Sequence, residues 1–267
     1  MSLDAARGLL ACPHCRSALE PEPGRWACPA GHSFDVARQG YLNLSGAAAS
    51  ANADSAAMVD ARARVLGAGV FAELTRGLDE LVPTDAATLL EAGAGTAYYL
   101  AGLVERRTGA CGVALDVSRP AARRAARAHP RVAAVVADVW QPLPLVDDCV
   151  DVVLCVFAPR NLAEFARVLR PGGLLVVATP AEEHLAGLRS RYGLLGLAED
   201  KRGRLAAAAG EHFDLIRTVM LRRSTQLSAS LVNDLIGMGP NAHHHPPRVA
   251  VDEWVEIAVE LSAFRPR

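Results

Sequence analysis

The chain has 267 residues, a formal net charge of −1 at pH 7 and a hydrophobic content of 51%. This length holds one large domain, or one ordinary domain and a small module, with a substantial core in either case. No run of about 18 apolar residues is present to span a bilayer, which excludes a membrane role. Residues 1–10 lack the basic head and apolar run of a secretory signal, so we expect a cytoplasmic protein.

Residues 1–44 contain a metal-binding pattern. Without a secretory signal, the six cysteines of the chain are expected in a reducing compartment, which favours metal binding or burial over disulfides. Four candidate ligands follow the spacing C-x2-C-x12-C-x3-H: Cys12, Cys15, Cys28 and His32. Three thiolates and one imidazole close a tetrahedral Zn²⁺ site with no open position, which predicts a structural ion and not a catalytic one. The region has too few aliphatic residues for a core of its own, so the metal is expected to fold it.

The pattern changes after this region. Residues 45–57 are small and polar without a periodic apolar face, and we interpret them as a linker, with a mobile alanine-rich helix as the alternative. Residues 58–267 have the pattern of an α/β domain. Apolar residues at helical spacing over 61–82 predict two helices, and the glycines within 67–69 predict a tight bend between them.

Apolar strands then alternate with helices. We predict strands at 87–91, 112–115, 132–136, 150–156 and 174–178, with helices at 98–105, 119–128 and 162–169. Continuous apolar strands separated by helices indicate a parallel sheet that is covered on both faces. Two segments with period-two character follow, at 215–221 and 255–261, with a helix at 227–236 between them. We expect the last segment to pair antiparallel with the fifth strand, which makes seven strands in one sheet.

A glycine-containing loop follows the first predicted strand of the α/β domain. It begins with Glu91 at the strand end and contains Gly93 and Gly95, which permit a sharp turn and close approach of a ligand. A dinucleotide-binding loop would have a third glycine where Tyr98 stands, and this side chain argues against a pyrophosphate at the helix start. A methionine-derived cofactor has no phosphate, and its ammonium group can meet the acidic residue. The pattern therefore favours S-adenosylmethionine over NAD.

Carboxylates also end the next two strands. Asp116 lies about twenty residues further on, where an acidic side chain can accept hydrogen bonds from both ribose hydroxyls. Asp138 follows the third strand and can accept from an adenine amino group, while Val139 packs on the ring. Three acids at successive strand ends favour a cofactor site over three unrelated solvent-facing residues. The predicted architecture is an α/β, class I (Rossmann-like) methyltransferase domain with a small zinc-binding module before it.

Five longer segments carry a family likeness, namely GHSFDVARQGYLNL at 31–44, MVDARA at 58–63, ADVW at 137–140, VFAPRN at 156–161 and MGP at 238–240. In this order, the chain resembles the large-subunit (23S) rRNA guanine-N1 methyltransferases over nearly its full length. The last three segments resemble the Gram-positive branch of the family. That branch includes proteins that give resistance to tylosin and mycinamicin.

The resemblance implies methylation of N1 of a guanine in a 23S rRNA hairpin loop near the macrolide site. It also implies that Gly95, Thr96 and His184 contact the cofactor. Phe71 stands where a cofactor-contacting tyrosine is expected in relatives, so one hydrogen bond is missing there. Ala97 replaces a third loop glycine of the family.

The loop at 157–161, after the fourth strand, is expected to face the reacting methyl group in this fold. We predict that Asn161 hydrogen-bonds the edge of the guanine and that Arg160 holds its O6 or a phosphate, with a solvent-facing arginine as the alternative. No carboxylate stands out as the general base. Basic side chains of the zinc module are expected to contact RNA phosphates: Arg16, Arg25 and Arg38. A denser basic stretch contains Arg189, Arg191, Lys201, Arg202 and Arg204, and a solvated helix face is its simpler interpretation.

Two other functions stay open at this point. A small-molecule methyltransferase would share the cofactor loop but would not need a zinc module, and the match over 31–44 counts against it. A non-catalytic RNA-binding protein would have no reason to keep the cofactor loop. The sequence does not decide which nucleotide is modified, whether the role is housekeeping or self-protection, or whether the chain forms a homodimer.

Overall fold

The computed structural model describes residues 2–46, 53–196, 208–244 and 246–267. Six of the thirteen residues of the predicted linker at 45–57, namely 47–52, lie outside the described residues, and a helix begins within it at Ala56. Lys201, Arg202 and Arg204 of the basic stretch also lie outside the described residues. Within the described part of the chain, no helix is both long enough and apolar enough to cross a membrane.

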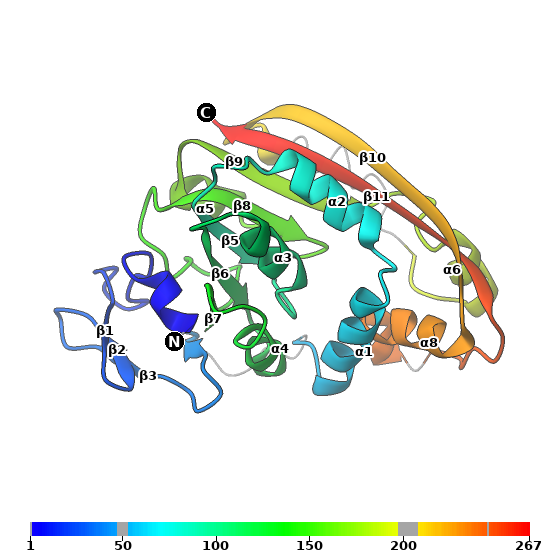
Figure 1. The fold of residues 1–267 in the computed structure, drawn as a ribbon, viewed down its shortest axis with the longest axis horizontal. Coiled ribbons are helices and arrows are strands. Elements are labelled where there is room, and N and C mark those ends of the chain that lie inside the picture. The colour runs from blue at the N-terminus through cyan, green and yellow to red at the C-terminus, as the bar shows by residue number, and fades with distance from the viewer. Residues whose placement is uncertain (1, 47–52, 197–207, 245) are drawn as a thin grey trace.

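An eight-stranded sheet forms the centre of the molecule, in the order β10-β11-β9-β8-β5-β6-β7-β4 (Figure 1). Its strands in chain order are β4 (Leu42–Asn43), β5 (Thr88–Ala92), β6 (Cys111–Asp116), β7 (Val132–Val136), β8 (Val150–Val156), β9 (Leu169–Pro180), β10 (Phe213–Leu227) and β11 (Glu253–Pro266). The strands from β4 to β9 run parallel to one another. β11 pairs antiparallel with both β9 and β10, which confirms the expected place of the last segment.

Helices cover the sheet. They are α1 (Ala56–Gly67), α2 (Ala72–Leu81), α3 (Tyr98–Arg106), α4 (Arg119–Ala125), α5 (Leu162–Val168), α6 (Ala186–Tyr192) and α8 (Ala229–Gly237), with 3-10 helices η1 (Ser2–Ala6) and η2 (Pro240–His244). Ser55 caps α1 because its hydroxyl accepts from the Met58 N–H, and Ser118 caps α4 in the same way. The predicted bend between the first two helices is confirmed, and Gly69 turns the chain there with a φ of +71°.

The strand residues alternate between two apolar clusters. Leu89, Val152 and Val176 belong to the cluster that includes residues of α2, α3 and α8. Their neighbours Leu90, Val153 and Val177 belong to the cluster that includes Phe165 of α5. Because side chains of a strand point alternately to opposite faces, the sheet is buried on both sides, as its continuous apolar strands predict.

The N-terminal region packs directly against this sheet. It contains a small antiparallel sheet of β1 (Glu20–Glu22), β2 (Arg25–Ala27) and β3 (Ser33–Asp35). Leu10 and Trp26 are buried in the same cluster as Phe165. β4 pairs with β7, and it adds an eighth strand to the seven that were predicted. A strand of two residues is too short to show a hydrophobic period, which is why the sequence does not reveal it.

Candidate metal centre and cofactor site

The four predicted zinc ligands converge in the N-terminal region. The ligand atoms of Cys12, Cys15, Cys28 and His32 all lie within 4.8 Å of one another. The Sγ atoms of Cys15 and Cys28 are 3.6 Å apart, and Nδ1 of His32 lies 3.4 Å from the Cys28 Sγ. In a tetrahedron with Zn–S of about 2.3 Å and Zn–N of about 2.0–2.1 Å, these edges measure roughly 3.8 Å and 3.5 Å. The four atoms therefore fit a tetrahedral zinc ion.

Two tight turns place these ligands. After Cys12, the Arg16 N–H donates to the Cys12 carbonyl at 2.9 Å, and Arg16 has a φ of +65°. After Cys28, the Gly31 N–H donates to the Cys28 carbonyl at 2.9 Å, with a φ of +86° at Gly31. A left-handed residue in each turn lets the chain reverse so that both members of a ligand pair face the same point.

The first turn is also fixed to the α/β domain. The Arg16 guanidinium donates to the carbonyls of Leu143 and Leu145, at 2.8 and 3.5 Å. Arg25 forms an exposed ion pair with Glu22 at 2.7 Å. Among the three arginines that were expected to contact phosphates, Arg38 is exposed and makes no ion pair with a described residue.

The predicted cofactor residues lie along the carboxyl ends of the parallel strands. Glu91, Asp116 and Asp138 end or follow β5, β6 and β7, which are neighbours in the sheet. Phe157 follows β8, and His184 follows β9. In open α/β sheets this edge is where ligands bind. The fold thus brings residues far apart in sequence to one edge.

The glycine loop packs closely against its surroundings. A Cβ atom on Gly93 would lie 2.4 Å from the Cβ of Ala158, in the loop after β8. Gly95 has a φ of +54°, and its N–H donates to the Asp116 carboxylate at 2.7 Å. Thr96 is buried, and Ala97 starts α3 with a φ of +56°. Ala97 therefore adopts the left-handed conformation that a third loop glycine would adopt without strain.

Two of the carboxylates are held in place by backbone N–H groups. Asp116 accepts from Ser118 at 2.8 Å as well as from Gly95, and burial raises its pKa. Glu91 is 1% exposed and accepts from the Leu100 N–H at 3.2 Å. Burial raises the pKa of Glu91 to about 8, and the neighbouring Asp116 adds to the effect. Near neutral pH, Glu91 is therefore largely protonated.

Replacing Glu91 by glutamine is expected to raise the melting temperature of the ligand-free protein, and more so at higher pH. The unfolded carboxyl loses its proton near pH 4.5 and the folded one near pH 8. Its contribution to stability is therefore complete below pH 4.5 and is lost as the pH rises through 8. Glutamine stays neutral and keeps an oxygen for the Leu100 N–H. Thermal unfolding between about pH 5 and 8.5 measures the difference.

Glu80→Gln, at an exposed position of α2, serves as the matched control. Its melting temperature should follow that of the wild type at every pH. A difference between Glu91→Gln and wild type that does not vary with pH would contradict the raised pKa.

Three rings gather at the same edge. The Phe71 ring centroid is 5.9 Å from that of Phe157 and 6.2 Å from that of His184. Nδ1 of His184 accepts from the Ala258 N–H of β11 at 3.3 Å, which holds the imidazole in place. Phe157 is 40% exposed and has a φ of +54°. A bulky residue in this conformation is strained, and such strain concentrates at functional sites.

The Arg62 side chain is a component of this site that sequence reasoning did not single out. Its Nη1 would lie 2.8 Å from a Cβ on Gly95, so the guanidinium rests on the glycine loop. It also forms an ion pair with Asp54 and donates to the Met238 carbonyl at 2.8 Å. The carbonyl of Asp54 accepts from the Ser118 hydroxyl at 2.7 Å. The only sequence signal for this arrangement is the family-like segment at 58–63.

The two predicted catalytic side chains differ in their surroundings. Nδ2 of Asn161 donates to the Val139 carbonyl at 3.0 Å, and its Oδ1 accepts from the Glu164 N–H as the cap of α5. This side chain joins the loops after β7 and β8. Nε of Arg160 is buried without a hydrogen-bond partner among the described residues. The adjacent thiol of Cys155 offers no counter-charge, because burial raises its pKa to about 12.

The loop after β7, where the adenine is predicted to bind, is partly apolar. Val139 is buried, and Trp140 beside it is 63% exposed. The Asp138 carboxylate accepts from the Trp140 N–H at 3.0 Å, which orients the start of this loop. An apolar surface beside an oriented carboxylate suits an adenine ring with its amino group.

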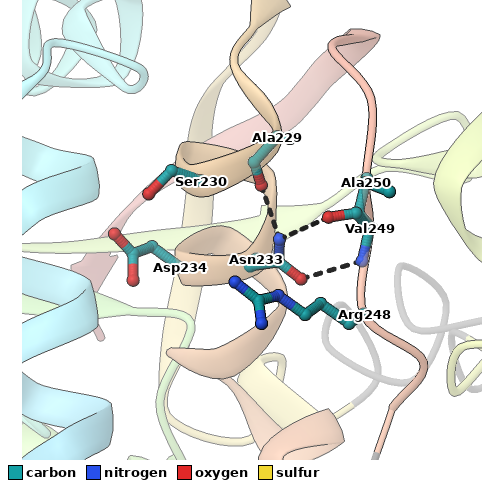
Figure 2. Close-up of a pocket in the computed structure, with 7 residues that line it drawn as sticks. All are labelled: Ala229, Ser230, Asn233, Asp234, Arg248, Val249 and Ala250. Carbon is teal, nitrogen blue, oxygen red and sulfur yellow. Dashed lines mark hydrogen bonds between the residues drawn. The ribbon is translucent and has the colours of Figure 1, made fainter.

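A separate hollow of about 590 Å³ lies between α8 and residues 248–250 (Figure 2). The Asn233 amide donates to the carbonyls of Ala229 and Val249 and accepts from the Val249 N–H (Figure 2). Asp234 pairs with Arg64 of α1. None of the predicted site residues lines this hollow, and the Asn233 hydrogen bonds join α8 to residues 248–250.

Comparison with known proteins identifies both parts of the chain. The family model for the N-terminal region of RlmA, a zinc ribbon, matches residues 10–46, and a methyltransferase-domain model matches residues 89–173. The solved complex of the Haloferax volcanii Trm112 methyltransferase activator with a methyltransferase is similar in fold. It has a TM-score of 0.53 and 18% identity, covering 81% of this chain and 99% of that one. Fold and site define an S-adenosylmethionine-dependent methyltransferase of class I with a structural zinc ribbon.

Two curated proteins are similar over most of the chain. The 23S rRNA (guanine(748)-N(1))-methyltransferase of Streptomyces fradiae is 43% identical over 94% of this chain and 90% of its own length. A Micromonospora griseorubida protein, provisionally named a 23S rRNA (guanine-N(1)-)-methyltransferase, is 42% identical over 96% of this chain and 97% of its own length. The chain belongs to the family of 23S rRNA guanine-N1 methyltransferases, which confirms the resemblance seen in the sequence.

Proposed function

We propose that the protein transfers a methyl group from S-adenosylmethionine to N1 of a guanine in 23S rRNA. The observation that carries this proposal is the 43% identity to the Streptomyces fradiae enzyme over 94% of the chain. The zinc ligands and the cofactor edge are both complete. A small-molecule methyltransferase would not need the first site, and a non-catalytic RNA-binding protein would not need the second.

The residues of the cofactor edge fit S-adenosylmethionine, which supplies an activated methyl group on a sulfonium when bound. Asp116 is placed to accept from the ribose hydroxyls, since a carboxylate has acceptor capacity beyond its two backbone bonds. Asp138 and Val139 are assigned to the adenine. The cofactor contacts expected of Gly95, Thr96, Phe71 and His184 belong to the same proposal.

Arg62 is proposed to hold the carboxylate of the cofactor's methionine portion. Its guanidinium rests on the glycine loop, and its positive charge partly offsets the burial that raises the pKa values of Glu91 and Asp116. Arginine binds carboxylates in a planar, two-pronged geometry, and a charge-assisted hydrogen bond contributes about 1.5–3 kcal/mol.

The variant Arg62→Gln is therefore expected to bind S-adenosylhomocysteine about ten- to a hundredfold more weakly. The binding of 5′-methylthioadenosine, which lacks the amino-acid group, should change by less than about twofold. Isothermal titration calorimetry measures both. Arg64→Gln, two residues along the same helix and exposed, is the control. Equal losses for the two ligands would show that Arg62 shapes the loop and does not bind the carboxylate.

The guanine is proposed to bind beside the loop after β8. Its N1 carries a proton at neutral pH, so the site must remove that proton or stabilise negative charge on O6. The unpartnered Nε of Arg160 is a donor suited to O6. The exposed ring of Phe157 offers a stacking surface for a base turned out of a hairpin loop. Asn161 acts in this proposal by holding the loop in place.

The two parts of the chain have separate roles in this proposal. Residues 1–44 form an RNA-recognition module, and residues 58–267 form the catalytic domain. A 23S rRNA hairpin as target places the enzyme in the cytoplasm, where ribosomal RNA is modified. Whether methylation protects against macrolides is tested by expression in a macrolide-sensitive host.

The direct test incubates the purified protein with labelled S-adenosylmethionine and either protein-free 23S rRNA or a panel of small metabolites. Primer extension then maps any methyl group. A stop at one loop guanine, where N1 methylation blocks Watson–Crick pairing, is the expected result. Label only in small molecules, or none in RNA despite cofactor binding, would overturn the proposal.

A further inference from the structure

A hollow of about 510 Å³ runs along α4, and we call it the α4 groove. In Figure 1, α4 lies between the zinc module and α1. The groove is lined by residues of all three: Arg38, Gln39, Ala56, Val59, Asp60, Pro120, Arg123, Arg124 and Arg127. Four of these nine side chains are cationic and one is acidic, in a chain whose overall charge is −1. The positive charge is therefore local.

The charge of the groove is largely uncompensated within the protein. Arg124 faces Asp60 at 3.7 Å, with both side chains more than half exposed. The guanidinium groups of Arg38, Arg123 and Arg127 form no ion pair or hydrogen bond with any residue that the structure describes. By contrast, the guanidinium of Arg131 donates to three backbone carbonyls. The arginines of the groove are thus available to a ligand.

The cationic side chains of the α4 groove gather around the C-terminal end of α4 and around the zinc module. Arg123 lies in the last turn of α4 and Arg127 in the turn that follows the helix, and both side chains line the groove. An anion in the groove would compensate this positive charge, and guanidinium groups match the geometry of phosphates.

The groove connects the zinc module with the cofactor edge. At one end, a Cβ on Gly40, two residues from Arg38, would lie 3.8 Å from the Cβ of Ala126. At the other end, α4 begins directly after Ser118. The Ser118 hydroxyl donates to the carbonyl of Asp54, which precedes the N-cap of α1. An RNA strand along α4 would therefore run from the module toward the edge that holds Asp116.

We propose that the α4 groove binds phosphate groups of the RNA substrate and so sets the position of the target loop; this rests on the proposed function. Its lining contains no aromatic side chain on which a base could stack. The contacts are therefore electrostatic and independent of base sequence. Recognition of the guanine itself stays with the loop after β8.

The test measures binding of the full-length, zinc-loaded protein to a fluorescein-labelled hairpin RNA of 23S sequence by anisotropy, between about 50 and 200 mM salt. The double variant Arg123→Gln/Arg127→Gln is expected to bind about tenfold more weakly at low salt. Two lost phosphate contacts should also reduce the slope of log affinity against log salt by about 1.4–1.8. Asp60→Asn, which removes the acid of the groove, should instead bind about two- to fivefold more tightly.

The matched control is Arg217→Gln/Arg265→Gln, which removes two exposed arginines from β10 and β11. It should keep the wild-type slope. S-adenosylhomocysteine affinity and melting temperature near wild type verify that each variant is folded. An unchanged slope in the α4 double variant, or an equal loss in the control, would overturn the proposal. So would failure of the wild type to bind the RNA.

Methyl transfer by the wild type to the same RNA separates the two proposals. If the wild type methylates a guanine and the α4 variants bind normally, the groove proposal fails and the function stands. If binding depends on the groove but no guanine is methylated, the groove stands and the proposed reaction fails.

Discussion

The variant Cys28→Ser is expected to lose the structural zinc ion and to unfold the N-terminal region. The thiolate contributes one of four ligands that fit a closed tetrahedron, and structural zinc sites contribute about 10–16 kcal/mol of apparent binding energy. Residues of this region are buried in the same apolar cluster as the sheet, so the whole protein should be destabilised. A loss of about 3–5 kcal/mol corresponds to roughly 10 °C in melting temperature.

Zinc content by atomic emission and hydrogen exchange over residues 10–44 are the measurements. Cys111→Ser, in strand β6 outside the metal centre, is the control and should keep one zinc ion per chain. A Cys28→Ser protein with full zinc content and normal exchange protection would show that these four residues are not a metal centre.

The variant Asp116→Asn is expected to bind S-adenosylhomocysteine at least a hundredfold more weakly. The carboxylate accepts from the N–H groups of Gly95 and Ser118, at 2.7 and 2.8 Å. An asparagine keeps one acceptor oxygen and directs an NH₂ group at the other donor. The variant thus loses the carboxylate acceptor for the ribose and disturbs the glycine loop. Two charge-assisted hydrogen bonds, at about 1.5–3 kcal/mol each, account for the hundredfold loss of affinity.

Calorimetric titration at neutral pH checks this result. Asp214→Asn, an exposed acid at the start of β10 that pairs with Arg267, is the matched control and should bind as the wild type does. A loss of less than about threefold in Asp116→Asn would remove this residue from the cofactor site.

Much of the fold follows from local patterns. Continuous apolar strands predicted the buried parallel sheet, and the glycines at 67–69 predicted the bend between α1 and α2. The zinc ligands were found because their spacing is fixed by short turns, which are local features. The antiparallel partner of β11 was predicted from its place at the end of an α/β pattern, and the structure pairs it with β9.

The features that the sequence did not predict depend on contacts between distant segments. Arg16 donates to carbonyls more than a hundred residues away, so its role in docking the zinc turn has no local signal. Arg62 reaches the glycine loop only because α1 packs over it. The engagement of the Asn161 amide with the Val139 carbonyl likewise requires the loops after β7 and β8 to meet.

The short strand β4 has a consequence for how the two parts of the chain depend on each other. Leu42 and Asn43 pair with Val135 and Val136, so they occupy the outer hydrogen-bonding side of β7. Without residues 1–46, the backbone N–H and C=O groups on that side of β7 would be unpaired. Exposed edge strands of this kind pair with strands of other molecules. The N-terminal region thus prevents β7 from pairing with a strand of a second molecule. Shortening the protein to its catalytic domain should yield aggregates, however intact the cofactor residues are.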